Sequence, residues 1–333
     1  MDHSCLFRSK VKWISLFLSV LVVFIHCTNT AGADPDLFAT HAETFVTGNL
    51  AAAAVPTFYA MSAFLFYRNF NLAKLASKYK SRIKTLLIPF LLWNTVYMIL
   101  FYFLSRLPFI NEEPFAFTWS VIVNGVLKNR FNDPYWFMRQ LILFTAFCPV
   151  IYAVMRNRYI AWTAYAGLLL AYGCGVGNVA GIDVRSLLFY LLGVYCGLHL
   201  QKQVVEANRF SWWVPTAFAL SQFLFYGGLA QRNPVLSWLH LVLLVVAYFG
   251  FVNLVAEKEL PEKLQCSFEI YTLHILILEA FNKLFGKILP PNTNWLLLDY
   301  FLSPLLTIGI IVIVSQIAKR KMPRIYSIAF GGR

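Results

Sequence analysis

Ten long apolar runs, separated by shorter polar segments, constrain the fold of this chain more than any other feature. A helix needs about 17 to 25 mostly apolar residues to cross the hydrocarbon core of a bilayer, and several of the runs reach that length. Inside lipid every backbone polar group must find a partner within the protein, so the runs predict membrane-spanning helices. They cover residues 11–27, 50–67, 86–105, 136–155, 159–174, 187–200, 212–229, 235–256, 270–285 and 295–317.

The composition agrees with lipid as the main solvent. Hydrophobic residues make up 59% of the chain and charged residues 13%, which is too little charge to keep a soluble protein dispersed. The formal net charge of +13 is spread over short clusters rather than one continuous patch, so it does not predict nucleic-acid binding. We therefore expect an all-α, polytopic integral membrane protein of about ten transmembrane helices, with the lipid bilayer as its partner.

The basic residues also predict the orientation in the membrane. If the N-terminus lies inside, most of the 28 Lys and Arg residues fall in cytoplasmic segments. Because cytoplasmic loops carry an excess of Lys and Arg, both termini are predicted to be cytoplasmic and the number of spans to be even. The basic residues left in outer segments are Arg106, Lys128, Arg130, Arg139, Arg185, Arg232, Lys283 and Lys287.

A cleavable secretory signal is the alternative interpretation of the N-terminus. Basic residues 8–12, an apolar core and Ala31-Gly32-Ala33 before Asp34 imitate such a signal, whose removal would take His26 with it. The retained span is favoured, because Lys12 sits at the edge of the apolar stretch and the small-residue site comes late.

The remaining segments predict one membrane-embedded domain over residues 1–333, without internal repeats. Its longest polar stretches are 28–49 outside and 69–85 inside, and residues 115–127 resemble an outer amphipathic helix followed by a turn at Asn132-Asp133-Pro134. The six cysteines lack metal or redox spacing, so no metal is expected, and a disulfide between Cys27 and Cys174 is an open but minor alternative.

Two histidines inside predicted spans are candidate functional residues, since an ionisable group in a membrane is costly unless it lines a cavity. His26 ends the first span, and imidazole is a suitable general base near neutral pH. His274 lies three residues after Tyr271, so the two side chains share a helix face. For both histidines the alternative is a packed side chain hydrogen-bonded to a neighbouring helix.

Several short motifs, in order, resemble acyltransferase family 3, whose members O-acylate cell-surface polysaccharides, lipopolysaccharide and peptidoglycan. No single motif is specific for the family, but the occurrence of all of them in this order across nearly the whole chain is specific. They are VVFIH at 22–26, VPTFYAMSAFL at 55–65, KSRIK at 80–84 before LLIPFLLW at 86–93, PYWFMRQL at 134–141 and IYTLH at 270–274.

The resemblance implies roles for individual residues. His26 would be the catalytic histidine, Arg82 would help to hold the phosphates of the acyl donor, and Ser62, Trp136 and His274 would line or support the site. Lys84 and Lys12 are further candidates for donor binding, and Arg139 and Tyr271 for the lining of the substrate site. For the basic cluster the alternative is plain anchoring of the inner loop.

The sequence departs from the family at three positions. Ser15 stands where the family usually has an Arg in the first span. Thr85 stands where a second Arg often follows Arg82 by three residues, and Ala63 stands where a Gly usually follows Ser62. The donor site is therefore expected to be rearranged, with Lys12 or Lys84 as substitutes.

The implied activity is transfer of an acyl group, with acetyl expected, from cytoplasmic acetyl-CoA to a hydroxyl of a surface polysaccharide or glycolipid, in the bacterial cytoplasmic membrane. His26 would deprotonate the acceptor or carry the acyl group as an acyl-imidazole, with Ser62, Tyr271 or Trp136 stabilising the oxyanion. An exporter or flippase of the same fold is the alternative, although the inverted repeats typical of transporters are not evident. A homo-oligomer is an open expectation.

Overall fold

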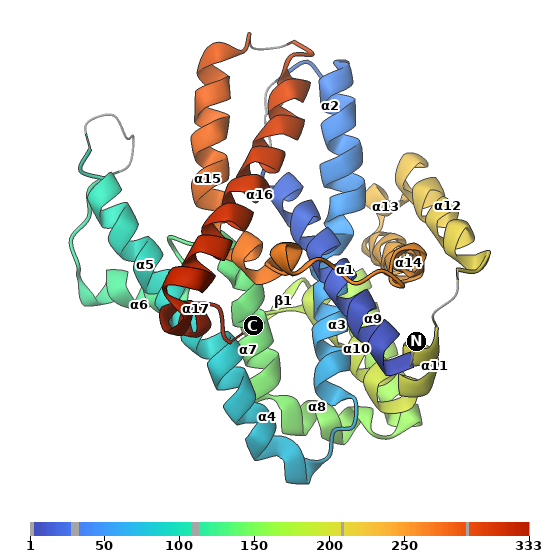
Figure 1. Ribbon diagram of the computed structural model, residues 1–333. Helices are drawn as coiled ribbons and strands as arrows, with labels where there is room; N and C mark the ends of the chain where they lie inside the picture. Colours follow the sequence, from blue (N-terminus) through green and yellow to red (C-terminus); the bar gives the residue numbers. More distant parts are fainter. Residues whose placement is uncertain (1–2, 28–32, 108–112, 208–209, 291–292, 333) are drawn as a thin grey trace. The chain divides into compact units, whose positions relative to one another are not determined.

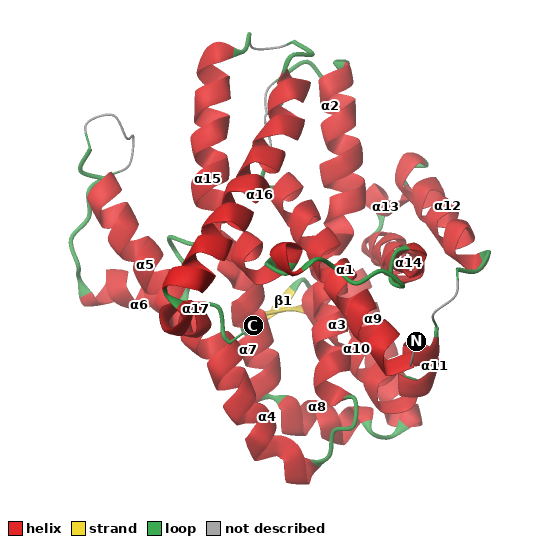
Figure 2. Cartoon of the chain, in the orientation of Figure 1, coloured by secondary structure: helices red, strands yellow, loops and turns green. Residues whose placement is uncertain are grey.

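The computed structural model describes residues 3–27, 33–107, 113–207, 210–290 and 293–332 (Figure 1). Helices form nearly all of the regular structure in these residues (Figure 2). Within them the one β element is an antiparallel hairpin of β1 (Asn178–Val179) and β2 (Ile182–Asp183). Its turn residues Ala180 and Gly181 have φ values of 51° and 84°, as a two-residue hairpin turn requires. The chain is therefore helical apart from this hairpin.

Contacts divide the chain into two compact units. Unit 1 comprises Met1–Asn69 and Tyr152–Gln316, and unit 2 comprises Phe70–Ile151 and Ile317–Arg333. The single domain over residues 1–333 stays a prediction.

Unit 1 holds the N-terminal helices, the central helices and the long helices near the C-terminus. Its first helix is a core element, because Ile14, Leu18 and Val23 are fully buried. Ala31 and Gly32 of the alternative cleavage site lie outside the described residues, and the retained first span stays a prediction. The elements are α1 (His3–Ile25), α2 (Phe38–Glu43), η1 (Thr44–Leu50), η2 (Ala51–Ala53), α3 (Ala54–Tyr67), α9 (Arg158–Gly173), α10 (Val184–His199), α11 (Gln201–Glu206), α12 (Trp213–Tyr226), α13 (Leu229–Arg232), α14 (Pro234–Phe251), η6 (Val252–Leu254), η7 (Glu262–Leu264), α15 (Ser267–Ile288) and most of α16 (Leu296–Lys321).

Small residues allow the helices of unit 1 to pack closely. A Cβ atom on Gly193 of α10 would lie 2.0 Å from the carbonyl oxygen of Ala60 on α3, and one on Gly250 of α14 would lie 2.2 Å from Val214 on α12. Helix pairs in membranes rely on this kind of close backbone approach, because lipid supplies no hydrophobic force between them.

Unit 2 is built around α5 (Ile88–Leu104). The indole of Trp93 donates a hydrogen bond to the carbonyl oxygen of Ala329 at 2.9 Å, and the side-chain amide of Asn94 donates one to the carbonyl oxygen of Val126 at 3.0 Å. The other elements of the unit are η3 (Leu72–Lys74), α4 (Leu75–Arg82), η4 (Ile83–Leu87), α6 (Trp119–Leu127), η5 (Asp133–Tyr135), α7 (Trp136–Ala146), the first half of α8 (Cys148–Met155), the end of α16 and α17 (Pro323–Ala329).

Two predicted polar stretches are helical over much of their length. The stretch 28–49 contains α2 and most of η1, and these continue into α3 as one helical segment, Phe38–Tyr67. The stretch 69–85 contains η3, α4 and part of η4, which continue into α5 as Leu72–Leu104. Apolar runs mark where lipid begins, whereas a helix continues for as long as its backbone hydrogen bonds do, so the apolar pattern placed these helix starts too late.

The predicted amphipathic helix 115–127 is shorter than expected. It begins at Trp119, where the Thr118 hydroxyl accepts a hydrogen bond from the amide of Val121 at 3.3 Å. Phe115 and Phe117 precede the helix in extended chain, and the ring of Phe117 stacks on Tyr102 at 4.3 Å between centroids. The helix therefore begins at Trp119, directly after the N-cap Thr118, rather than at Phe115.

The structure contains four helical segments that are long and apolar enough to cross a membrane, counted within the described residues. They are Phe38–Tyr67, Leu72–Leu104, Pro234–Leu254 and Leu296–Lys321. A fifth arises if the bent pair Asp133–Ala146 and Cys148–Met155 counts as one span. Each of the ten predicted apolar runs coincides with helix in whole or in large part, but the number of ten spans and the cytoplasmic termini stay predictions.

The predicted span 136–155 is not a straight helix. Its two halves, α7 and α8, meet at an angle of 67°. Pro149 explains the break, because it lacks an amide hydrogen and its ring clashes with the carbonyl four residues earlier.

The surface of α16 fits lipid rather than water. Leu305, Ile313 and Ile317 are 61%, 62% and 56% exposed on a segment with a mean hydropathy of 2.2. Exposed apolar side chains along a whole helix are costly in water and neutral in hydrocarbon, which identifies the chain as a membrane protein.

Candidate active site

The two predicted histidines lie next to each other in unit 1. His26 follows the last turn of α1, and His274 lies in the middle of α15. Their ring centroids are 5.1 Å apart with 49° between the planes. Residues 26 and 274 are far apart in the sequence, so only the packing of α1 against α15 brings them together.

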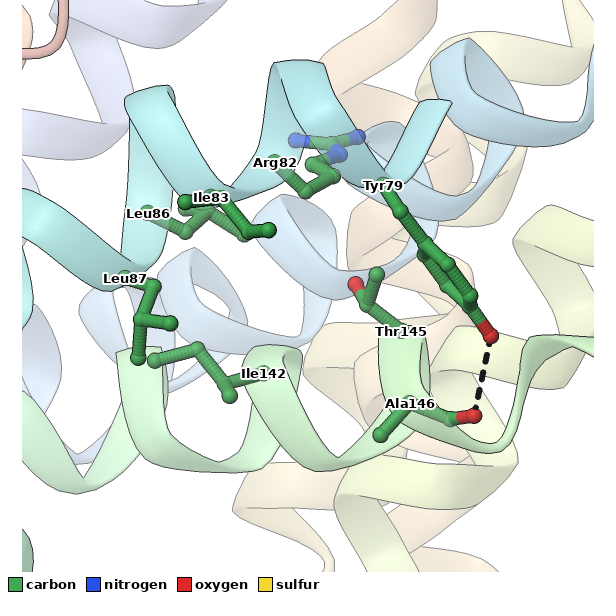
Figure 3. A pocket seen from close by; sticks show the side chains of 8 residues that line it. All are labelled: Tyr79, Arg82, Ile83, Leu86, Leu87, Ile142, Thr145 and Ala146. Carbon is green, nitrogen blue, oxygen red and sulfur yellow. Dashed lines mark hydrogen bonds between the residues drawn. The ribbon is translucent and has the colours of Figure 1, made fainter. Parts of the chain in front are cut away.

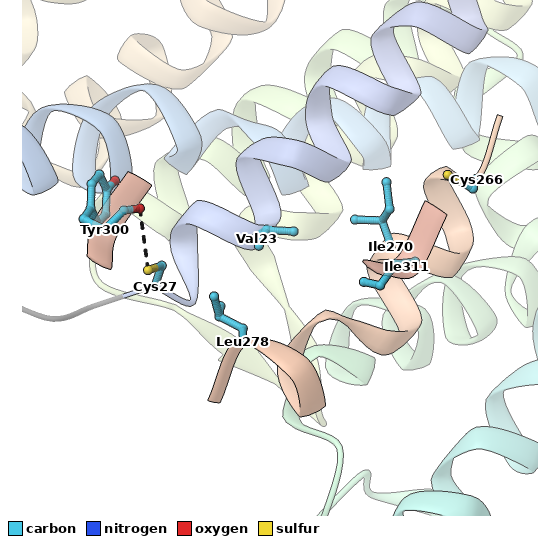
Figure 4. Packing of buried hydrophobic residues seen from close by; sticks show 7 residues of the cluster. All are labelled: Val23, Cys27, Cys266, Ile270, Leu278, Tyr300 and Ile311. Atoms are coloured by element: carbon cyan, nitrogen blue, oxygen red, sulfur yellow. Dashed lines mark hydrogen bonds between the residues drawn. The ribbon is translucent and has the colours of Figure 1, made fainter. Parts of the chain in front are cut away.

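Apolar contacts on both sides of the histidine pair hold the two helices. Val23 of α1 and Ile270 and Leu278 of α15 belong to one buried cluster with Tyr300 of α16 (Figure 4). The hydroxyl of Ser19 also donates to the carbonyl oxygen of Ser267 at 3.0 Å. The pair therefore lies in a rigid part of unit 1, where rotation of either ring would disturb close packing.

The hydrogen bonds of His274 determine its tautomer. Its Nδ1 lies 3.1 Å from the carbonyl oxygen of Ile270 and 2.8 Å from that of Tyr271. Carbonyl oxygens only accept, so Nδ1 carries the hydrogen and the lone pair of this neutral imidazole is on Nε2. Nε2 is buried and has no hydrogen-bond partner among the described residues, and His274 as a whole is 0% exposed. Nε2 of His274 is therefore an acceptor that receives no hydrogen bond from the described residues. The ring beside it, that of His26, is half-buried.

A pocket of about 320 Å³ in unit 2 contains the predicted donor-binding residue Arg82 (Figure 3). Its walls are mainly aliphatic, and the hydroxyl of Tyr79 donates across one end to the carbonyl oxygen of Ala146 at 3.1 Å. The lining comes from α4, η4 and α7 and comprises Tyr79, Arg82, Ile83, Leu86, Leu87, Ile142, Thr145 and Ala146. An apolar pocket with one guanidinium suits a ligand that has both an aliphatic part and an anionic part.

Comparison with known proteins places this chain in a family. The sequence model of an acyltransferase domain, acyltransferase family 3, matches residues 11–318. The chain belongs to acyltransferase family 3. It is therefore an acyltransferase, and the match covers both units.

One curated relative extends the comparison. The chain is 25% identical over 354 aligned residues to the succinoglycan biosynthesis protein ExoH of Rhizobium meliloti (strain 1021), covering 98% of this chain and 92% of the relative. No solved structure matches the chain.

The other predicted site residues of this family 3 acyltransferase are distributed over both units. Ser62 is half-buried on α3, and Tyr271 is buried on α15 with its ring 6.4 Å from that of His274. Trp136 and Arg139 are half-buried on the first turn of α7, the helix that also lines the Arg82 pocket. Tyr271 thus joins the histidine pair, while Trp136 and Arg139 share a helix with the pocket.

The substitutes expected for the missing arginines are both on the surface. Lys84 is exposed on η4 and Lys12 is exposed on α1. Of the departing positions, Ser15 donates to the carbonyl oxygen of Val11 in its own helix at 2.7 Å, whereas Thr85 is half-buried on η4. In unit 2, Lys84 stands two residues from Arg82, so the basic charge near the pocket is partly retained.

Sequence reasoning missed several buried polar groups. Lys10 is 3% exposed and donates to the carbonyl oxygen of Ala207 at 3.0 Å, although the sequence predicts only a cytoplasmic position for the basic residues 8–12. Asp299 is 3% exposed and accepts a hydrogen bond from the hydroxyl of Ser303. A carboxylate inside the predicted span 295–317 is the signal that could have pointed to it.

A second buried polar group surrounds His240 on α14. Its Nδ1 lies 3.0 Å from the hydroxyl and 3.1 Å from the carbonyl oxygen of Ser221, and Gln222 pairs with Asn49 of η1 at 2.5 Å. This network ties α12 and α14 to η1, which is the role of a packed histidine.

The cysteines form no disulfide within the described residues. Cys27 is buried and Cys174 is exposed, so the alternative pairing of these two is not seen. Among the described residues no cluster of three or more His, Cys, Asp or Glu side chains is arranged to hold a metal ion.

Proposed function

We propose that this acyltransferase moves an acetyl group from cytoplasmic acetyl-CoA to a hydroxyl of a cell-surface polysaccharide or glycolipid. The observation that carries the proposal is the histidine pair, in which His274 is held as a neutral acceptor 5.1 Å from the ring of His26. The Nδ1 hydrogen of His274 is used on the helix carbonyls, and its ring lies directly beside the imidazole of His26, which we propose as the general base.

The glycan acceptor follows from the relative as well as the family. The name of ExoH connects that protein to the synthesis of succinoglycan, and the similarity extends over 98% of this chain. We infer the same class of acceptor, a bacterial surface glycan, for this chain.

Binding of the acyl donor is assigned to unit 2. The guanidinium of Arg82 is suited to phosphate through charge-assisted hydrogen bonds, and the aliphatic walls of the pocket suit the chain between phosphate and thioester. Lys84 supplies further positive charge at an exposed position of unit 2, whereas Lys12, exposed on α1 of unit 1, stays a separate predicted contact of the donor. When bound, the donor supplies an activated thioester carbonyl.

His26 is the proposed catalytic base. In direct transfer, its imidazole takes the proton of the acceptor hydroxyl as that oxygen bonds to the acyl carbon; the carbon–sulfur bond breaks, and the imidazolium returns the proton to the departing thiolate. In the two-step route an imidazole nitrogen of His26 bonds to the acyl carbon, the carbon–sulfur bond breaks, and the imidazole N–H proton goes to the departing thiolate. The acceptor oxygen then bonds to the acyl carbon, the acyl–nitrogen bond breaks, and the hydroxyl proton returns to the imidazole. Ser62, Tyr271 and Trp136 are the proposed donors to the oxyanion, and Arg139 a residue of the acceptor site.

The proposed setting is the bacterial cytoplasmic membrane, with ten spans and both termini in the cytoplasm. This orientation puts the basic helix α4 on the side of the acyl donor, as the excess of Lys and Arg in the inner segments requires. The helix end at His26 then lies toward the outer face, where the glycan is presented.

The test is release of free CoA from acetyl-CoA by purified protein in lipid nanodiscs supplied with cell-envelope glycans. We expect release to depend on glycan and to be lost in His26→Ala, while His41→Ala, which removes an exposed imidazole of α2, retains it. A folded parent protein without thioester turnover on any envelope fraction, combined with transport of labelled glycan, would replace the proposal with an exporter.

A further inference from the structure

The turn that carries His26 is held by side chains from two other elements. α1 ends at Ile25, and the last carbonyl groups of a helix lack partners within the helix. The carbonyl oxygen of Phe24 is one of them: it accepts from the amide of Cys27 at 3.2 Å and from the hydroxyl of Thr47 at 3.0 Å. Thr47 belongs to η1, which packs against α1.

The hydroxyl of Thr47 also lies 2.8 Å from that of Tyr300 on α16. A threonine hydroxyl has a single hydrogen, and Thr47 uses it on a carbonyl oxygen that only accepts. Tyr300 must therefore be the donor in the second bond. The direction of the chain is fixed: Tyr300 donates to Thr47, and Thr47 donates to Phe24, so each bond strengthens the next.

Tyr300 fixes the same turn by packing. Its side chain is 1% exposed, and its ring lies 5.4 Å from that of Phe24. Its carbonyl oxygen lies 3.7 Å from the thiol of Cys27 (Figure 4). Contacts from Tyr300 and Thr47 thus reach the residues on either side of His26 while leaving its imidazole to face His274.

The backbone of η1 is unusual at the position of Thr47. Residues Thr44–Leu50 form a π-helix, a rare conformation that is frequent at functional sites. The wider winding rotates the side chains relative to an α-helix, and in this register Thr47 meets α1 while Asn49 meets Gln222 on α12.

We infer that Thr47 and Tyr300 are positioning residues that hold the last turn of α1 so that the imidazole of His26 faces His274 in reactive geometry. This inference rests on the proposed catalytic role of His26. The two hydroxyls bond to each other and to the backbone of α1, so we expect their effect on the placement of the base rather than on donor binding.

Three variants separate the hydroxyl from the bulk of the side chain. Thr47→Val keeps the shape and removes the hydrogen bonds, Thr47→Ser keeps the hydroxyl, and Tyr300→Phe keeps the buried ring. Thr216→Val is the matched control, because that exposed hydroxyl only bonds to the carbonyl oxygen of Trp212 in its own helix at 2.8 Å. Turnover of acetyl-CoA with envelope glycans gives kcat and KM.

We expect Thr47→Val to lower kcat about 10-fold or more, since misplacement of a catalytic group by about 1 Å is enough to cost a factor of 100. KM for acetyl-CoA should not change, Thr47→Ser should restore kcat, and Tyr300→Phe should lie between Thr47→Val and the parent protein. Parental kcat in Thr47→Val, or an equal loss in Thr47→Ser, would overturn the inference.

A second readout does not depend on turnover. The rate at which diethylpyrocarbonate modifies His26, followed by mass spectrometry in nanodiscs, should change in Thr47→Val and Tyr300→Phe but not in Thr216→Val. Unchanged modification in both variants also overturns the inference. If His26→Ala retains turnover while these rates change, the proposed function fails and the positioning of His26 by the two hydroxyls stands.

Discussion

The histidine pair of unit 1 and the Arg82 pocket of unit 2 differ in almost every physical respect. At the pair, imidazoles are packed against helices, and a network of hydrogen bonds fixes even the tautomer of His274. At the pocket there is open volume of about 320 Å³, an aliphatic wall and one guanidinium. Rigid polar geometry suits bond-making, whereas apolar volume beside a cation suits binding, so the difference supports the proposal that the base lies in unit 1 and the acyl donor binds in unit 2.

Both regions are built on a π-helical segment. In unit 1, η1 presents Thr47 to α1, and in unit 2, η4 contributes Ile83, Leu86 and Leu87 to the pocket. Each of these segments continues into a long apolar helix, at Ala54 and Ile88 respectively. The same backbone device thus orients a hydrogen-bonding side chain in one unit and aliphatic side chains in the other.

The largest effect should come from the base itself. His26→Ala is expected to lower kcat by about 10²- to 10⁴-fold, because a positioned general base contributes on that scale. KM for acetyl-CoA should change little if donor affinity belongs to unit 2. Steady-state turnover in nanodiscs measures kcat and KM, with His41→Ala as the control. A raised KM at unchanged kcat would contradict the proposal that His26 acts in the chemistry and unit 2 in donor binding.

The next effect should come from Arg82 and should fall on KM. Arg82→Ala is expected to raise KM for acetyl-CoA about 10- to 150-fold, since charge-assisted hydrogen bonds contribute about 1.5 to 3 kcal/mol. Arg82→Lys should recover part of this, because lysine keeps the charge and loses the planar fork. Arg158→Ala, at an exposed basic residue that starts α9, is the control. A loss in kcat alone would assign Arg82 to the chemistry.

Filling the pocket should have a smaller effect in the same direction. Ala146→Leu adds aliphatic volume to the lining, and we expect KM to rise about fivefold, which corresponds to about 1 kcal/mol of steric cost. Ala164→Leu makes the same change at an exposed position of α9. Equal KM values in the two variants would show that the donor does not occupy the pocket.

The sequence predicts the helical membrane fold better than it predicts which residues are neighbours. Apolar runs locate helices because lipid dictates their composition, and motif order points to His26 and His274, whose catalytic roles stay predictions. Neither signal tells which helices are neighbours, so the 5.1 Å contact of the rings came only from the structure. Thr47 was missed for a related reason: the stretch 28–49 is polar, and polarity says nothing about whether a segment is helical.

The smallest effect should come from Lys84, and salt should separate it from Arg82. Lys84 is exposed on η4, whereas Arg82 is half-buried in the pocket lining. Lys84→Ala should raise KM for acetyl-CoA by about twofold at low salt, because exposed ion pairs contribute about 0.2 to 1 kcal/mol. At 1 M salt the screening length falls to about 3 Å, so this effect should vanish while most of the Arg82→Ala effect persists. KM measured for both variants across salt concentrations makes the comparison. If both effects disappear together, Arg82 acts as surface charge like Lys84, and the pocket loses its role as the place where the anion is held.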